Sequence, residues 1–209
     1  MKVSWVSERS GRSGIHVSAG EYDGTPPVGT LWLEYDPVSH HPDRLALAAA
    51  LAFGGYMSGE IALNTESVSV GVAQGLVAAL APFLQSVHPS HLPQKRFPEG
   101  TGTLVLARSS AVEDLPSDDV RGRTTLQLTR MDQASGRLLQ GRTLTVSTNA
   151  EVIRQLAYDL NGLITFPELA VAVLLAEDLG CDEIVTALDL DFERWRPAFT
   201  AAGLRILGA

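Results

Sequence analysis

The sequence predicts an α+β fold: N-terminal strands with two buried Ala-rich helices, then a β-hairpin followed by an α-α-β-α-β succession. Three observations lead to this class. The first 35 residues carry alternating or apolar runs broken by Gly and Pro, as strands joined by turns do. Leu45–Phe53 is an unbroken apolar run, which suits a buried helix. Two capping-box patterns, Thr148–Glu151 and Thr165–Glu168, each open a segment with helical periodicity.

The N-terminal half is expected to contain strands and two helices. The first helix should begin at Pro42, because proline followed by an acid suits a helix N-terminus, and extend to about Met57. A second, Ala/Gly-rich helix should cover Ser69–Ala81 and end at Pro82, and its small side chains permit close packing. The expected strands are Val3–Val6, Gly14–Ala19, Gly29–Tyr35 and Ser58–Asn64.

A proline-containing loop follows the second helix. Residues 87–101 hold little apolar content, and such a segment is the best candidate for a domain boundary. The boundary would divide the chain into an N-terminal α+β region, 1–100, and a C-terminal α/β region, 101–209. A single domain is the alternative.

A strand at Thr103–Ala107 and a β-hairpin are predicted next. Arg123–Met131 and Leu138–Ser147 alternate apolar and polar residues and would pair across residues 132–137. The core face would hold Leu126, Leu128, Leu144 and Val146. The opposite face would show Arg123, Thr125, Gln127, Thr129, Thr143, Thr145 and Ser147.

The rest of the chain predicts two helices, a strand, a helix and a strand. The first helix follows Thr148–Glu151 and ends at Gly162, a natural C-cap, and the second runs from the Thr165 box to Leu179. The last elements are the strand Glu183–Leu188, the helix Phe192–Ala202 and the strand Leu204–Leu207. A strand, helix and strand at this spacing suggest a parallel βαβ unit.

Composition and charge limit the possible functions. The chain is 45% hydrophobic and 19% charged, which is typical of a soluble globular protein. Its formal charge of −8 argues against general attraction to nucleic acid or anionic lipid. It has no apolar run of about 18 residues, no secretory leader and one cysteine, so a cytoplasmic location without a membrane is expected. The motifs GxxxxGK[ST], GxGxxG, GxSxG, CxxC and HExxH are all absent.

Carboxylates near the C-terminus form the first candidate site. Asp189 and Asp191 follow a predicted strand, and oxygen ligands at that position can hold Mg²⁺ or Mn²⁺ for phosphodiester hydrolysis. With Leu175–Thr186 and Gly203–Leu207, these residues resemble the closing segment of PIN-domain ribonucleases. The resemblance implies that Asp189 and, one residue displaced, Glu168 are catalytic acids acting on RNA. Alternatively, Asp189 and Asp191 cap the following helix.

Histidines and arginines form two further candidates. His40, His41, His88 and His91 would supply four imidazoles to a transition metal if folding joined the two pairs, although loop histidines are the simpler interpretation. Arg121, Arg123 and Arg142 lie in an arginine-rich stretch of an acidic chain and are candidates for binding a protein partner. A solvated sheet face is the alternative there.

The function that these features favour is non-catalytic. A well-formed fold without a strong catalytic motif is predicted to be a binding or accessory subunit of an assembly, with a protein partner or a second copy. The alternative is a nuclease that uses Mg²⁺ or Mn²⁺ with Asp189, Asp191, Glu168 and further acids from Glu177 and Asp178. A histidine-based metal-binding protein comes third.

Overall fold

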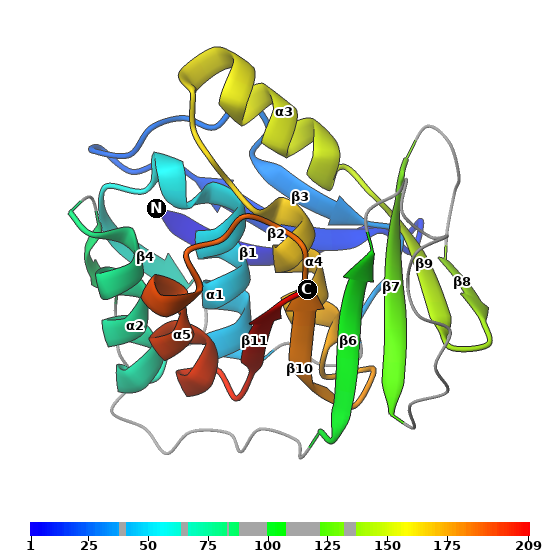
Figure 1. Cartoon of the computed structure of the whole chain (residues 1–209). Coiled ribbons are helices and arrows are strands. Elements are labelled where there is room, and N and C mark those ends of the chain that lie inside the picture. Colours follow the sequence, from blue (N-terminus) through cyan, green and yellow to red (C-terminus); the bar gives the residue numbers. More distant parts are fainter. Residues whose placement is uncertain (38–40, 64–66, 83, 88–99, 108–121, 132–136) are drawn as a thin grey trace.

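The computed structural model describes residues 1–37, 41–63, 67–82, 84–87, 100–107, 122–131 and 137–209 (Figure 1). Its helices are α1 (Pro42–Phe53), the short 3-10 helix η1 (Gly54–Tyr56), α2 (Val70–Leu80), α3 (Ala150–Asn161), α4 (Pro167–Leu175) and α5 (Phe192–Ala201). Its strands are β1 (Lys2–Ser7), β2 (Ser13–Ser18), β3 (Thr30–Leu33), β4 (Gly59–Leu63), β5 (Leu84–Val87), β6 (Gly102–Ala107), β7 (Arg123–Arg130), β8 (Arg137–Gln140), β9 (Thr143–Thr148), β10 (Cys181–Thr186) and β11 (Arg205–Gly208). Helices and strands together confirm the α+β class.

The strands lie side by side in the order β11-β10-β6-β7-β9-β3-β2-β1-β4-β5, and β8 also pairs with β9. From β11 to β9 every neighbouring pair is parallel. The sheet then becomes antiparallel from β9 through β3 and β2 to β1, and β4 and β5 are parallel to β1 and to each other. The first group, β11-β10-β6-β7-β9, is called the parallel half below.

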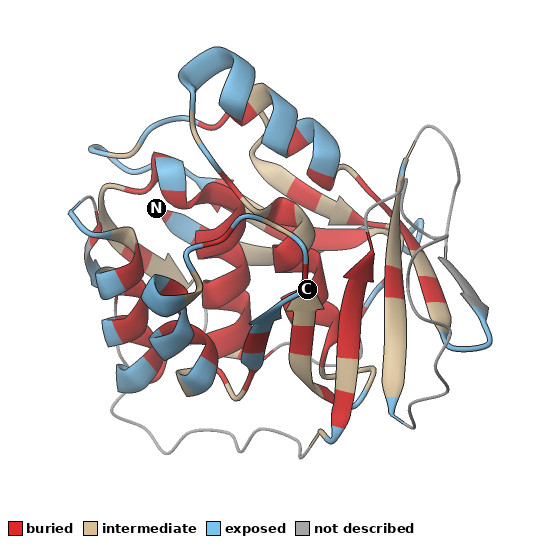
Figure 2. Ribbon diagram, viewed as in Figure 1, coloured by how far each residue is buried: buried red, intermediate tan, exposed pale blue. Residues whose placement is uncertain are grey.

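The helices α1 and α4 occupy the centre of the core (Figure 2). Each residue of Leu45–Phe53 is at most 7% exposed, and Leu169–Leu175 is equally buried. The two helices pack against each other, and α2 packs against α5. Residues on both sides of the predicted boundary near residue 100 therefore contribute to one hydrophobic cluster.

Most of the C-terminal order follows the prediction. The succession α3-α4-β10-α5-β11 is the predicted α-α-β-α-β arrangement, and β10 and β11 are parallel neighbours. The helix α4 ends at Leu175, four residues before its predicted end at Leu179, and a turn then leads to Gly180. In the part of the chain that the structure describes, no helix has the length and apolar character needed to span a bilayer.

The predicted hairpin between Arg123–Met131 and Leu138–Ser147 is wrong. The strands β7 and β9 are parallel. β9 pairs antiparallel with β3 and with β8, and the turn Gly141-Arg142 joins β8 to β9. Gly141 has a φ of +60°. Two-residue hairpin turns need a positive φ at their first position, and glycine adopts it without steric strain.

The predicted core and outer faces of these strands are nevertheless largely correct, because side chains alternate along a strand whichever direction its neighbour runs. Leu126, Leu144 and Val146 are at most 2% exposed, and Leu128 packs partly buried against the same core. On the other face, the following side chains are partly exposed: Arg123, Thr125, Gln127, Thr129, Thr143 and Thr145. Ser147 differs, because it is buried.

Close packing of α2 against α5 depends on Gly75. A methyl group at this position would lie 2.6 Å from Ala198 Cα and 2.7 Å from its backbone nitrogen, so α2 would have to move. We expect Gly75→Ala to lower the free energy of unfolding by about 1–2 kcal/mol, because overpacking outweighs the helix propensity that alanine adds. Urea denaturation measures this change.

Gly71→Ala is the matched control in the same helix. Its added methyl group would meet only the Ala201 side chain, at 3.2 Å, and we expect little or no loss of stability. Equal destabilisation by the two substitutions would contradict the close approach at Gly75.

Candidate functional site

A cavity of about 650 Å³ lies where the carboxyl ends of β6, β7, β9 and β10 meet the first turns of α3 and α4. In Figure 1, β6 and β10 point toward α3, which lies across this end of the parallel half. Open α/β sheets place their ligands outside the carboxyl ends of parallel strands. The cavity therefore occupies the position where a ligand site is expected for this topology.

The cavity wall is largely apolar. Leu106 and Leu128 line it from the sheet, and Leu163 and Phe166 line it from the segment between α3 and α4. At the rim, Tyr158 is 63% exposed and Ile164 is 75% exposed, although both also line the cavity. A ligand with an apolar body would cover these two side chains as well as the inner wall.

The start of α3 is fastened to β3. Asn149 accepts a hydrogen bond from the Trp32 N–H (2.8 Å) and donates one to the Thr30 carbonyl (2.9 Å). The Thr148 hydroxyl donates to the Trp32 carbonyl (2.7 Å) and accepts from the Ala150 N–H (3.2 Å). These contacts take the place of the predicted capping box. The Thr148 hydroxyl binds both β3 and the Ala150 N–H, whereas the Asn149 side chain binds β3 and makes no cap hydrogen bond to α3.

The start of α4 is fastened to α1. The backbone N–H of Phe166 donates to the Leu51 carbonyl (2.8 Å), and α4 begins at the next residue without a side-chain cap. The second predicted capping box is therefore also wrong. Thr165, which would have been the cap, is 3% exposed, and its Oγ1 has no hydrogen-bond partner within the described residues.

Two ion pairs in the cavity wall join different elements of the fold. Arg154 on α3 binds Glu168 on α4 at 2.7 Å, and Arg130 at the end of β7 lies 3.8 Å from Glu151 on α3. The Arg154 pair joins the two helices beside the cavity. The second carboxylate oxygen of Glu168, Oε2, is buried and, among the described residues, has no hydrogen-bond partner.

The predicted catalytic acids separate into two groups. Asp189 and Glu168 both line the cavity, whereas Asp191 does not and instead caps α5, accepting a hydrogen bond from the Arg194 N–H (3.2 Å). Glu177 and Asp178 belong to the turn after α4, where Asp178 accepts a hydrogen bond from Tyr35 (2.5 Å). Among the described residues, no three His, Cys, Asp or Glu side chains are grouped to hold a metal ion.

The histidine hypothesis has one member within the described residues. His41 is 3% exposed, and its Nδ1 accepts a hydrogen bond from the Asp43 N–H at the start of α1. It is a helix cap, as a helix-entry histidine can be. His40, His88 and His91 lie outside the described residues, so the four-histidine site stays a prediction.

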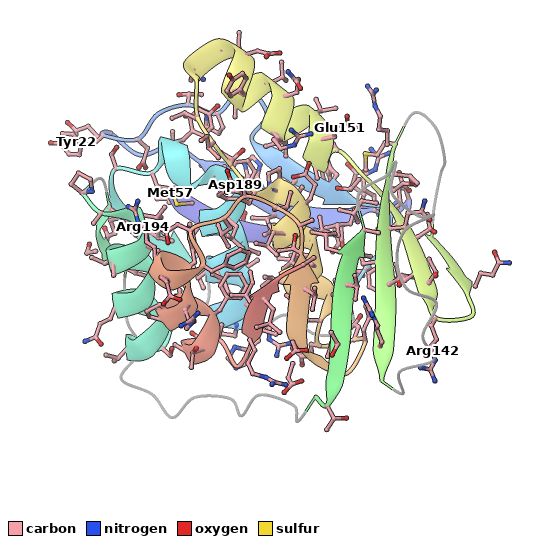
Figure 3. All side chains as sticks on the ribbon, viewed as in Figure 1. Tyr22, Met57, Arg142, Glu151, Asp189 and Arg194 are labelled. Atoms are coloured by element: carbon pink, nitrogen blue, oxygen red, sulfur yellow. The ribbon has the colours of Figure 1, made fainter. Side chains whose placement is uncertain are left out.

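The arginine candidates lie at the opposite end of the parallel half. Arg123 begins β7, and Arg142 is exposed in the turn before β9. Figure 3 shows Arg142 at the lower end of these strands, with Glu151 and Asp189 toward the upper end. Arg121 lies outside the described residues.

Cys181 does not take part in the cavity chemistry. It is 1% exposed at the start of β10, and burial, together with the charge of Asp182, raises the pKa of its thiol to about 11. The thiol is therefore protonated near neutral pH and is a poor nucleophile.

No protein-family model, curated protein or solved structure matches this chain. The function of this chain is therefore inferred from the geometry of its cavity.

Proposed function

We propose that this protein is a non-catalytic binding protein that takes up a small organic molecule in the cavity at the carboxyl ends of β6, β7, β9 and β10. The observation that carries the proposal is the cavity itself. Its volume of about 650 Å³ falls within the range of small-molecule sites, roughly 300–1,000 Å³. Its apolar wall with a few polar groups also has the composition usual for such sites.

The charged groups of the cavity wall favour binding over catalysis, because both arginines of the wall are already paired with glutamates. Cleavage of RNA through Asp189 and Glu168 with Mg²⁺ or Mn²⁺ is the second hypothesis, supported by their common position in the cavity. It would require a third ligand, which the described residues do not supply.

Filling the cavity tests the proposed function. Ala187 is exposed, follows β10 and lines the cavity, so Ala187→Phe would place a ring in it without disturbing the core. Fragments with one ring and one polar head should raise the melting temperature of the wild type. We expect Ala187→Phe to weaken the hits about tenfold or more in calorimetric titration.

Ala19→Phe is the matched control, because Ala19 is also an exposed alanine that directly follows a strand, β2, but lies away from the cavity. It should leave the affinities unchanged. Hits that bind Ala187→Phe as tightly as the wild type would show that the cavity is not the binding site.

A partner surface is proposed separately on the outer face of β7 and β9. Parallel strands are usually covered on both faces, yet Thr125, Gln127 and Thr143 are only partly buried. Arg123 and Arg142 lie at one end of this face and would attract an acidic partner or an acidic part of a second copy. This is the accessory role that the sequence favoured.

Charge reversal tests the partner surface. Arg123→Glu combined with Arg142→Glu should weaken association with a co-purifying protein or a second copy, and wild-type association should decrease as salt rises. Light scattering after size exclusion and pull-down measure both. The control, Arg9→Glu with Arg196→Glu, makes the same change in net charge at exposed arginines elsewhere. Equal association of both double variants would exclude the arginine face as the docking surface.

A further inference from the structure

The charges of the cavity wall are unbalanced toward the negative. Two arginines, Arg130 and Arg154, line the cavity together with three carboxylates, Glu151, Glu168 and Asp189. Each arginine is paired with one glutamate. Asp189 is exposed to the cavity mouth and has no ion-pair partner among the described residues. A positively charged group would neutralise the remaining carboxylate, whereas an anion would have to displace an existing pair.

Two unsatisfied polar atoms of the wall can each accept a hydrogen bond from a ligand. Glu168 Oε2 is an acceptor, and Thr165 Oγ1, on a side chain that is 97% buried, has lone pairs to offer. By contrast, another buried threonine of the wall, Thr186, has a partner: its Oγ1 accepts a hydrogen bond from the Leu188 N–H (3.2 Å). Burying an unsatisfied polar atom is costly, so a ligand's donor that reaches either atom would be stabilised.

The apolar side chains of the wall determine which kind of ligand, apart from its charged group, the cavity can hold. The inner apolar side chains and the exposed Tyr158 and Ile164 at the rim would exclude a fully hydrated ion and favour an apolar group. Tyrosine also offers a ring face that attracts cations.

We propose that the ligand of this cavity is an organic cation: a primary or substituted amine carried on an apolar body. Its ammonium group donates hydrogen bonds toward Thr165 and Glu168, and Asp189 adds negative charge at the mouth. The apolar body covers Leu128, Phe166 and the rim. This inference rests on the proposed function, because it names the ligand class of the same cavity.

Three probes with one body and different heads test the inference: 4-phenylbutylamine, 4-phenylbutanol and 4-phenylbutyrate. Calorimetric titration of the full chain gives the three dissociation constants. We expect the amine to bind about tenfold more tightly than the alcohol, since hydrogen bonds to charged groups are the stronger ones, and the carboxylate to bind least.

Two variants with isosteric side chains locate the head group. Thr165→Val removes the hydroxyl, so it should weaken amine binding several-fold while raising the melting temperature of the ligand-free protein, because an unsatisfied buried group is lost. Asp189→Asn removes the charge at the mouth and should reduce the preference for amine over alcohol. Asp191→Asn is the control: it is two residues away, is outside the cavity wall and keeps a good N-cap.

The outcomes separate the two proposals. Tighter binding of the alcohol or the carboxylate at a site blocked by Ala187→Phe would overturn the organic-cation inference and leave the binding function intact. Binding of other fragments at that site, without binding of the amine, would also overturn the organic-cation inference and leave the binding function intact. Absence of any binding sensitive to Ala187→Phe would overturn both. Displacement of the amine by Mn²⁺ alone would overturn the inference in favour of a metal site.

Discussion

The packing of α1 against α4 is the interaction on which the rest of the structure depends. Every residue of Leu45–Phe53 is buried, so α1 has no solvent-facing side and must be covered by elements from both halves of the chain. Each leucine or phenylalanine buried there contributes about 1.5–3 kcal/mol. Because Phe166 N–H binds the Leu51 carbonyl, the same packing fixes the start of α4, and with it Thr165 and Glu168 at the cavity.

A buried guanidinium joins α1 to α5. Arg44 is 3% exposed and donates to the carbonyls of Ala202 (3.4 Å) and Gly203 (3.5 Å), at the end of α5. Burial lowers the pKa of Arg44, while the negative charges of Glu177 and Asp182 act in the opposite direction. Glu177, which the sequence offered as a further nuclease acid, therefore stabilises a buried cation, which is a structural role.

The local elements could be predicted from the sequence, whereas the pairing that creates the site could not. Periodicity and turn residues located α1, α2, α3 and α5 to within a few residues. A hairpin would place the carboxyl ends of β7 and β9 at opposite ends of the sheet. Their parallel pairing instead brings Arg130 and Thr148, at the two carboxyl ends, side by side. The sequence alone predicts Asp189 and Glu168 as candidate acids of the site. Thr165 and the Arg154–Glu168 pair depend on tertiary contacts that no local pattern encodes.

The parallel half thus presents two ends with different chemistry. Its carboxyl end holds an apolar cavity with unmatched acceptors, and its amino end carries exposed arginine. The organic-cation proposal is tested most directly by a crystal structure of the wild-type chain soaked with 4-phenylbutylamine. We expect the ammonium nitrogen within about 3.2 Å of Thr165 Oγ1 or Glu168 Oε2, with the ring against Leu128 and Phe166. An empty cavity with the amine bound elsewhere, or a ring-first orientation that leaves both oxygens without a partner, would contradict it.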